Sequence, residues 1–581
     1  MMLIEKSALE RIQQRLARIY PEVVATEYAP RVIELAGRYA EEIARAAGVA
    51  RGEDFALEDA ILITYGDMVR SEGEAPLATL HRFAKSQLGG ALNTIHILPC
   101  FPYTSDDGFS VSDYRRIDPA LGDWPDLQAM SEDFRLMYDF VCNHCSASHE
   151  WFQQFLRDEA PGRHYVQTGD PSADLSAVVR PRPTPVLTEF QTATGSRFVW
   201  TTFSPDQIDL DFHNPNLLLE MLDILLLYFA RGAGLIRLDA IAFLWKEPGT
   251  SCLHLPQTHE VVKLMRDIVD LFAPGKVLMT ETNVPHRENV SYFGAGDEAQ
   301  MVYQFSLPPL ILYSMLTGSA RELTRWALDL EPPPANCSYF NFTASHDGIG
   351  VRPLEGLVPE AEVEFLCEAV RARGGQVSYR TRPDGSQSPY ELNITYFEAV
   401  SDPTAAHPDV NIQRFLLSQA VPLTLQGVPG VYFHSLTAAP NWLEGVAETG
   451  RARTINRRKW ELDELEALLS DKSATSAKVF EAYRRLLRLR RGQPALHPRG
   501  AQLILDLDPT IFAIERSAPP ELPGQQILAL YNFSRDAISI ALPPPSLAGH
   551  WVYEMVTAQP LPRHLTELNL APHAFVWLSN V

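Results

Sequence analysis

The sequence predicts an α/β fold built on a (β/α)8 TIM barrel, in which eight parallel strands alternate with eight helices. Between residues 58 and 497, short apolar runs alternate with segments of helical periodicity. Strands that are apolar along their whole length are buried on both faces, as in a parallel sheet covered by helices. Three of the runs lead into a carboxylate, at Asp239, Glu281 and Asp347. Because active sites of such barrels lie at the carboxyl ends of the strands, we expect these acids to cluster there.

Eight candidate strands can be placed in chain order. They are residues 60–66, 94–99, 135–141, 235–239, 277–281, 302–305, 339–345 and 422–426. Two long segments interrupt the alternation, at about residues 146–210 after the third strand and about 351–409 after the seventh. Loops of this length are usually functional or form small inserted domains, so an inserted domain and a second insertion are predicted.

The two ends of the chain depart from the barrel pattern. Residues 1–57 carry apolar positions at spacings of three and four, which predicts an N-terminal helical extension. From residue 498 onward, short strands are separated by proline-rich turns, which predicts a C-terminal antiparallel β domain. A chain of 581 residues has room for a barrel and these additional parts.

Composition excludes several functional classes. Hydrophobic residues make up 46% and charged residues 21%, as in ordinary globular proteins. The net charge of −22 argues against a nucleic-acid surface and against binding to anionic membranes. No apolar run is long enough to span a bilayer, and the first residues lack a signal-peptide pattern. Six scattered cysteines suit free thiols in a reducing compartment. We therefore expect a cytoplasmic monomer or homodimer that acts on small molecules.

Arg237 and Asp239 are the first specific sign of a site. They stand two residues apart in a predicted strand, so their side chains point to the same face. Such a pair alone is more often a buried structural ion pair. The acids that end two further strands favour a functional carboxylate cluster instead.

Four motifs resemble, in order, the signature regions of the α-amylase superfamily, glycoside hydrolase family 13. They lie at residues 139–144, 234–239, 280–282 and 344–347, and the resemblance spans about residues 58–581. Each motif is weak alone, but four in order are specific. Residues 105–114, 202–211, 341–350 and 455–457 resemble the sucrose phosphorylase subfamily. Residues 243–254 and 388–393 look most like its glucosylglycerate phosphorylases.

The resemblance implies a role for each acid. Asp239 matches the nucleophile that forms a covalent β-glucosyl-enzyme, and Glu281 matches the general acid and base. Asp347 matches the residue that holds the ring hydroxyls of the sugar and stabilises the transition state. Residues that match binders of glucose hydroxyls are Asp106, His144, His346 and Arg457, and those that match the platform and the group near the nucleophile are Phe109, Phe203 and Gln207.

Physical chemistry supports these roles independently. A retaining mechanism needs two carboxyl groups about 5–5.5 Å apart, one ionised and one protonated. Arg237 beside Asp239 is expected to keep that carboxylate ionised. Glu281 has no basic residue immediately beside it in the sequence, which is compatible with a raised pKa.

Phosphorolysis also needs groups that bind phosphate and the acceptor. Tyr390 and Glu391 match positions on the phosphate and acceptor side of sucrose phosphorylases, but Glu391 replaces a glutamine, which makes fructose a less expected acceptor. A dianion that approaches carboxylates requires cations or backbone amides. The candidates for phosphate are Arg180, Arg182 and Arg352, and those for a glycerate carboxylate are Lys246, His254 or an arginine.

The resemblance implies no required metal and no cofactor, with inorganic phosphate as the co-substrate. Amylases often bind calcium through an asparagine at the position of Asn143, whereas the sucrose phosphorylase relatives generally do not.

The favoured hypothesis is a glycosyltransferase of the retaining α-glucoside phosphorylase type. It would convert 2-O-α-D-glucosylglycerate and phosphate reversibly into α-D-glucose 1-phosphate and glycerate. One alternative is a phosphorylase of glucosylglycerol, sucrose 6-phosphate or sucrose. Another is an amylosucrase-like transglucosylase or an α-glucoside hydrolase. A non-catalytic member of the family is disfavoured, because Asp239, Glu281, Asp347 and Arg237 are all present.

Overall fold

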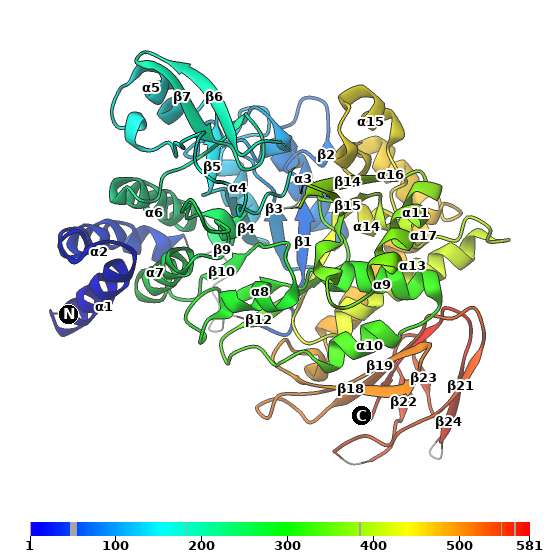
Figure 1. Ribbon diagram of the computed structural model, residues 1–581. Coiled ribbons are helices and arrows are strands. Elements are labelled where there is room, and N and C mark those ends of the chain that lie inside the picture. The colour runs from blue at the N-terminus through cyan, green and yellow to red at the C-terminus, as the bar shows by residue number, and fades with distance from the viewer. Residues whose placement is uncertain (1, 47–54, 183, 383–384, 548, 563–564) are drawn as a thin grey trace.

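A closed barrel of eight parallel strands forms the centre of the molecule (Figure 1). The computed structural model describes residues 2–46, 55–182, 184–382, 385–547, 549–562 and 565–581. All eight pairings around the barrel are parallel. The predicted barrel is therefore confirmed. Its strands are β1 (Ile61–Thr64), β3 (Thr94–Ile97), β4 (Arg135–Phe140), β9 (Ala233–Leu238), β10 (Val277–Thr280), β11 (Met301–Tyr303), β12 (Ser338–Phe342) and β16 (Val428–Tyr432).

The last barrel strand was wrongly placed by the sequence analysis. Residues 422–424, expected in a strand, form the end of helix α13 (Pro408–Thr424), and β16 begins at Val428. The apolar run through this region is continuous, and such a run fits a buried helix as well as a buried strand. Gly427 makes the turn between them with φ +131°, and a side chain there would begin 2.5 Å from the carbonyl oxygen of Tyr339.

Helices cover the outside of the barrel (Figure 1). They alternate with the strands because their apolar faces bury the outer surface of the sheet. These helices are α3 (Pro76–Leu88), α4 (Trp124–Ser131), α6 (Pro215–Ala230), α7 (Pro256–Phe272), α8 (His286–Val290), α9 (Leu307–Thr317), α10 (Arg321–Leu328), α13, α14 (Phe433–Thr437), α15 (Leu443–Thr449), α16 (Leu462–Ser470) and α17 (Thr475–Arg491).

Two insertions follow barrel strands. After β4 the chain forms β5 (His144–Ser146), α5 (Glu150–Arg157), β6 (Leu187–Thr192), β7 (Gly195–Trp200) and β8 (Gln207–Asp209). After β12 it forms β13 (Ile349–Gly350), α11 (Glu360–Ala372), β14 (Gln376–Thr381), β15 (Gln387–Asn393) and α12 (Tyr396–Val400). Both insertions extend loops at the carboxyl ends of the strands, so they can contribute side chains to a site there.

The N-terminal residues form a helical hairpin on the outside of the barrel. Helices α1 (Met2–Ile19) and α2 (Glu22–Arg45) pack beside α6 and α7 (Figure 1). Arg15 Nε donates to Asp267 at 2.8 Å, and the Tyr39 hydroxyl donates to Asp223 at 2.9 Å. Residues 47–54 of the predicted extension lie outside the described residues.

The C-terminal residues form an antiparallel β structure below the barrel in Figure 1. One sheet has the order β18-β19-β20-β25-β22-β23, and β21 pairs with β24. We propose that residues 1–57, 58–497 and 498–581 are the domains of the chain. The strands are β18 (Ala501–Asp508), β19 (Ile511–Ser517), β20 (Gln526–Asn532), β21 (Ile538–Ala541), β22 (Tyr553–Glu554), β23 (Gln559–Pro560), β24 (Glu567–Leu570) and β25 (Phe575–Ser579).

Candidate active site

A cavity lies at the carboxyl end of the barrel and is open to solvent at its mouth. The three acids predicted from the strand ends, Asp239, Glu281 and Asp347, all line it. The structure also brings to this cavity the predicted residues Asp106, Phe109, His144, Phe203, Gln207, Arg237, His346, Tyr390 and Glu391. Arg457 lines the adjoining part of the opening.

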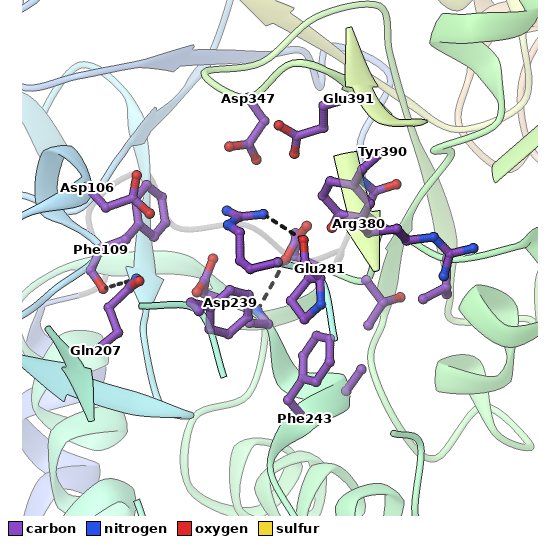
Figure 2. Close-up of a pocket in the computed structure, with 18 of the residues that line it drawn as sticks. Asp106, Phe109, Gln207, Asp239, Phe243, Glu281, Asp347, Arg380, Tyr390 and Glu391 are labelled. Atoms are coloured by element: carbon purple, nitrogen blue, oxygen red, sulfur yellow. Dashed lines mark hydrogen bonds between the residues drawn. The ribbon is translucent and has the colours of Figure 1, made fainter. Parts of the chain in front are cut away.

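Asp239 and Glu281 meet because they end neighbouring strands at the same level. Leu238 on β9 pairs in register with Thr280 on β10, and each acid is the next residue of its strand. Figure 2 shows the two carboxylates at the centre of the cavity, between Asp106, Phe109 and Gln207 on one side and Tyr390 and Arg380 on the other.

Arg237 holds the carboxylates together. Its Nη1 donates to Asp239 Oδ1 at 2.8 Å and also forms an ion pair with Asp139, while Nη2 lies 3.7 Å from Glu281 Oε2. Asp139 is bound on its other side by His96 at 2.7 Å. The guanidinium is therefore shared among three acids.

The electrostatics of the pair differ from the simple expectation that Arg237 alone keeps Asp239 ionised. Burial raises the pKa of Asp239 well above its ordinary value, since the desolvation outweighs Arg237 and Glu281 lies close by. Burial raises the pKa of Glu281 as well. Two close carboxyl groups titrate as a pair that retains one proton. The shorter contact of Arg237 with Asp239 favours the negative charge there and the proton on Glu281.

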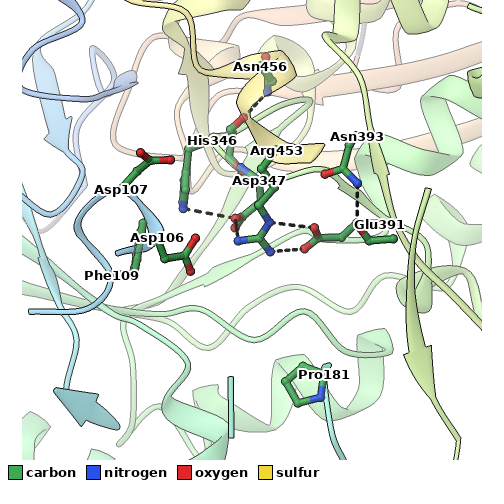
Figure 3. Close-up of polar contacts among 12 residues, drawn as sticks. Asp106, Asp107, Phe109, Pro181, His346, Asp347, Glu391, Asn393, Arg453 and Asn456 are labelled. Atoms are coloured by element: carbon green, nitrogen blue, oxygen red, sulfur yellow. Dashed lines mark hydrogen bonds and ion pairs between the residues drawn. The ribbon is translucent and has the colours of Figure 1, made fainter. Parts of the chain in front are cut away.

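Asp347 belongs to a separate charge network (Figure 3). Arg453 Nη1 lies 2.7 Å from Asp347 Oδ1, and Arg453 donates two further bonds, of 3.0 and 2.5 Å, to the buried Glu391. Burial alone would raise the pKa of Asp347, but Arg453 and the neighbouring His346 and Arg457 lower it below its ordinary value. Asp347 is therefore ionised at neutral pH.

The sequence analysis missed Arg453 and Arg380, which both line the cavity. Arg453 precedes the 455–457 motif by two residues, so its position next to that motif was a usable signal. Arg380 lies on β14 in the second insertion, where no motif marks it.

The predicted binding residues form one side of the cavity. His144 Nε2 donates to the carbonyl oxygen of Phe109 at 2.9 Å, and Gln207 lies beside both. Burial lowers the pKa of His144, so its ring is neutral. Phe109 stacks on His346 with ring centroids 4.8 Å apart. This side presents apolar ring faces and neutral polar edges, which suits a sugar ring.

Arg457 fixes the backbone around Asp347. Its Nε donates to the carbonyl oxygen of His346 at 2.9 Å, and Nη1 lies 2.5 Å from Asp107 and 3.8 Å from Asp106. It thus holds the backbone beside Asp347 and lines the adjoining part of the opening.

Four arginines also line the cavity, Arg180, Arg182, Arg352 and Arg380, and we name the part that they line the arginine side. Arg182 lies over the rings of Phe203 and Tyr390, 5.8 and 5.9 Å from their centroids. In the described part of the chain, neither Arg180 nor Arg182 has a carboxylate within 4.0 Å. Several cations that line the same cavity as Asp239 and Glu281 suit an anionic ligand.

Two residues expected to bind a carboxylate have other partners. Lys246 is buried, with Nζ 2.6 Å from Asn143 Oδ1 and 2.9 Å from Asp209 Oδ2. His254 lies 2.9 Å from the Tyr292 hydroxyl and 3.2 Å from Glu288. Neither lines the cavity. Each side chain instead has partners from distant parts of the sequence.

The ammonium group of Lys246 lies between two oxygen ligands that could otherwise hold a cation. Both Asn143 and Asp209 are fully buried. Within the described ranges, no group of three or more histidine, cysteine or acidic side chains has a geometry that could hold a metal ion. The charge needed beside Asp209 is thus supplied by the chain itself.

We expect Lys246→Met to destabilise the protein by about 3–5 kcal/mol, because it leaves the Asp209 carboxylate buried and unpaired. The measurement is the free energy of unfolding in urea. Lys246→Met combined with Asp209→Asn removes the unpaired charge and should recover part of the loss. A single variant as stable as the parent would show that the ion pair contributes little.

The fold and the site define a class: a (β/α)8-barrel protein with three carboxylates at the strand ends, the arrangement used for glycosyl transfer. Comparisons with known proteins agree. Residues 87–330 match the alpha-amylase catalytic domain. Glucosylglycerate phosphorylase of Spirochaeta thermophila is 50% identical over 476 residues, which cover 82% of this chain and 80% of that protein. The enzyme of the same name from Escherichia coli is 44% identical over 82% of this chain and 85% of its own length.

Solved structures show the same fold. The crystal structure of sucrose 6F-phosphate phosphorylase from Thermoanaerobacter thermosaccharolyticum superposes with a TM-score of 0.71 at 24% identity and covers 84% of this chain and 96% of that one. The chain therefore belongs to the α-amylase superfamily, glycoside hydrolase family 13, within which it groups with the glucosylglycerate phosphorylases and, at lower identity, with the sucrose phosphorylases. The resemblance carried by the motifs is confirmed.

Proposed function

We propose that the protein is a retaining α-glucoside phosphorylase that converts 2-O-α-D-glucosylglycerate and phosphate reversibly into α-D-glucose 1-phosphate and glycerate. One observation carries the proposal: a single cavity joins a cluster of three carboxylates to the arginine side. A glycosidase cavity has no need of so many cations, whereas a phosphorylase of an anionic glucoside binds phosphate and an acidic acceptor next to its acids. The identity to relatives named glucosylglycerate phosphorylase supports the same substrate.

The first half-reaction cleaves the glycosidic bond. Asp239 attacks the anomeric carbon of glucose, and Glu281 gives its proton to the departing oxygen of glycerate. The raised pKa of Glu281 keeps that proton available near neutral pH. The products are a covalent β-glucosyl-enzyme and free glycerate.

The second half-reaction releases glucose 1-phosphate. An oxygen of hydrogen phosphate attacks the anomeric carbon, the bond to Asp239 breaks, and Glu281 accepts the proton from phosphate. Two inversions at the same carbon restore the α configuration. The enzyme returns to its starting protonation state.

Other residues hold the sugar in place for both steps. We assign Asp347 to the ring hydroxyls of glucose, in its ionised form, and Arg453 to the orientation of Asp347. The remaining glucose contacts in the proposal come from Asp106, Phe109, His144, Phe203, Gln207, His346 and Arg457.

Arg180, Arg182 and Tyr390 form the phosphate contact in this proposal. The two arginines have no carboxylate partner in the described residues, so their charge is available to a dianion. The guanidinium group of Arg182 lies over the rings of both Tyr390 and Phe203. Tyr390 lines the cavity and the adjoining part of the opening.

The test is release of α-glucose 1-phosphate from four glucosides, with and without phosphate. We expect strong, phosphate-dependent release from glucosylglycerate and weak release from glucosylglycerol, sucrose and sucrose 6-phosphate. Free glucose formed at the same rate without phosphate would indicate a hydrolase. If another glucoside reacted faster, the acceptor would be the group released from that glucoside and not glycerate.

We further propose that the enzyme acts in the cytoplasm, as a monomer or homodimer that binds no nucleic acid. All six cysteines are buried free thiols, which suits a reducing compartment. Among the described helices, none combines the length and apolarity needed to cross a membrane.

A further inference from the structure

The arginine side contains a pair of arginines that the mechanism above does not use. Arg352 follows β13 and Arg380 lies on β14, and both line the cavity. Their side chains are only 11% and 15% exposed. Each is held at its tip by a glutamate, Arg352 by Glu288 at 3.3 Å and Arg380 by Glu355 at 2.5 Å. The pair is thus held in place by ion pairs while it lines the cavity.

The pair has unsatisfied binding capacity. In the described structure, the Nε atoms of Arg352 and Arg380 are buried and have no hydrogen-bond partner. Burial and the neighbouring Arg352 lower the pKa of Arg380, although Glu355 opposes them. Buried donors without acceptors are costly, and like charges repel. An anion placed between the two guanidinium groups would relieve both effects.

The position of the pair relates it to the bond that is broken. Glu281 continues into Thr282 and Asn283, which also line the cavity. Asn283 lies against the backbone of β13, since a side chain on Gly350 would begin 2.5 Å from Asn283 Oδ1. Gly350 stands two residues before Arg352, and Glu288, the partner of Arg352, lies on α8 shortly after Glu281. The pair therefore adjoins the loop that carries the proton donor.

A glycerate acceptor carries its carboxylate close to the bond that is broken. The carboxylate is bonded to the carbon that carries the glycosidic oxygen, so it must lie beside the group that protonates that oxygen. A guanidinium group binds a planar carboxylate through two parallel hydrogen bonds. Asn283 Oδ1, which is buried and without a partner in the described residues, can accept a hydrogen bond from a hydroxyl of glycerate.

We propose, on the basis of the function proposed above, that Arg352 and Arg380 form the acceptor-carboxylate site, while phosphate is bound by Arg180 and Arg182 in the same cavity. Another arginine that lines the cavity is engaged with the acids of the glucose site. Arg453 is bound to both Glu391 and Asp347. The enzyme thereby selects an acidic acceptor over a neutral polyol through a pair of residues that its phosphate half-reaction does not require.

The test compares two reactions of Arg380→Gln and Arg352→Gln. Synthesis from α-glucose 1-phosphate is measured with glycerate and with glycerol as acceptor, and arsenolysis of α-glucose 1-phosphate is measured without either. We expect the preference for glycerate over glycerol to fall by about 100-fold or more, because hydrogen bonds to a charged ligand are lost. Arsenolysis uses only phosphate-type anions and should stay within about threefold of the parent.

Controls separate the carboxylate site from other effects. Arg382→Gln removes a partly exposed arginine that pairs with Glu360 and should change neither reaction. Arg182→Gln should impair arsenolysis while it keeps the preference for glycerate. Arg380→Lys retains the charge and should keep part of that preference, which covers the case in which the glutamine variants fold poorly.

Two outcomes would overturn the assignment. Equal losses of arsenolysis and glycerate transfer in Arg380→Gln would make the pair a phosphate site. An unchanged glycerate to glycerol ratio would remove it from acceptor recognition. Failure of the proposed function itself has a different signature, because the parent enzyme would then not transfer glucose to glycerate at all.

Discussion

Asp239→Asn is expected to lower phosphorolysis by about 10⁴-fold or more, because an amide cannot form the covalent glucosyl intermediate. The variant should also lose covalent labelling by a 2-fluoroglucosyl fluoride, read by the mass of the intact protein. Asp239 directly follows β9 and accepts a hydrogen bond of 2.8 Å from Arg237 at the centre of the cavity.

The same substitution should leave the fold intact. The folded-state pKa of Asp239 lies above its ordinary value. An acid with a raised pKa lowers stability as the pH rises past its unfolded pKa, so a neutral asparagine removes that effect at pH 7. We expect the thermal midpoint to be equal to that of the parent or higher. Asp463→Asn, at an exposed position on α16, is the matched control and should affect neither activity nor labelling. Labelling that persists in Asp239→Asn would move the nucleophile to another residue.

Glu281→Gln is expected to lower phosphorolysis of glucosylglycerate by about 10³-fold, because glycerate cannot leave without a proton. With α-glucosyl fluoride as donor, formation of the glucosyl-enzyme should fall by less than about tenfold, because fluoride is a weak base and leaves unprotonated. The measurement is the rate of the first half-reaction by rapid quench with each donor.

The pH dependence supplies a second readout for Glu281. Burial raises its pKa, so the acid stays protonated to a higher pH than an exposed glutamate does, and activity should fall as the pH rises through that value. This fall in activity at alkaline pH reports the titration of the Asp239–Glu281 pair. It should be absent when Glu281→Gln reacts with the fluoride donor. Glu444→Gln, at an exposed position on α15, serves as control. Equal losses with both donors would remove Glu281 from the role of acid.

Much of the fold was predictable because each barrel strand has a local sequence pattern. A buried parallel strand is a short apolar run, and the residue that follows it lies at the carboxyl edge. Asp239 and Glu281 were found in this way, and the register of β9 with β10 places them side by side. The eighth strand was misplaced because the apolar run of α13 extends to the barrel without a change in composition, and periodicity does not separate a buried helix from a buried strand.

The sequence by itself determined the barrel, the order of the motifs, the three acids and most of the residues on the Asp106 side of the cavity. The barrel and the acids are local properties, set by the period of the apolar residues and the residue types at the strand ends, whereas the residues on the Asp106 side followed from the resemblance of the motifs to a known family. Only the tertiary structure decided how the basic residues are used. Lys246 is bound to Asn143 and Asp209, while Arg453 and Arg380 line the cavity. The role of a long charged side chain depends on the carboxylates that it contacts. Those carboxylates come from distant segments that only the folded chain brings together.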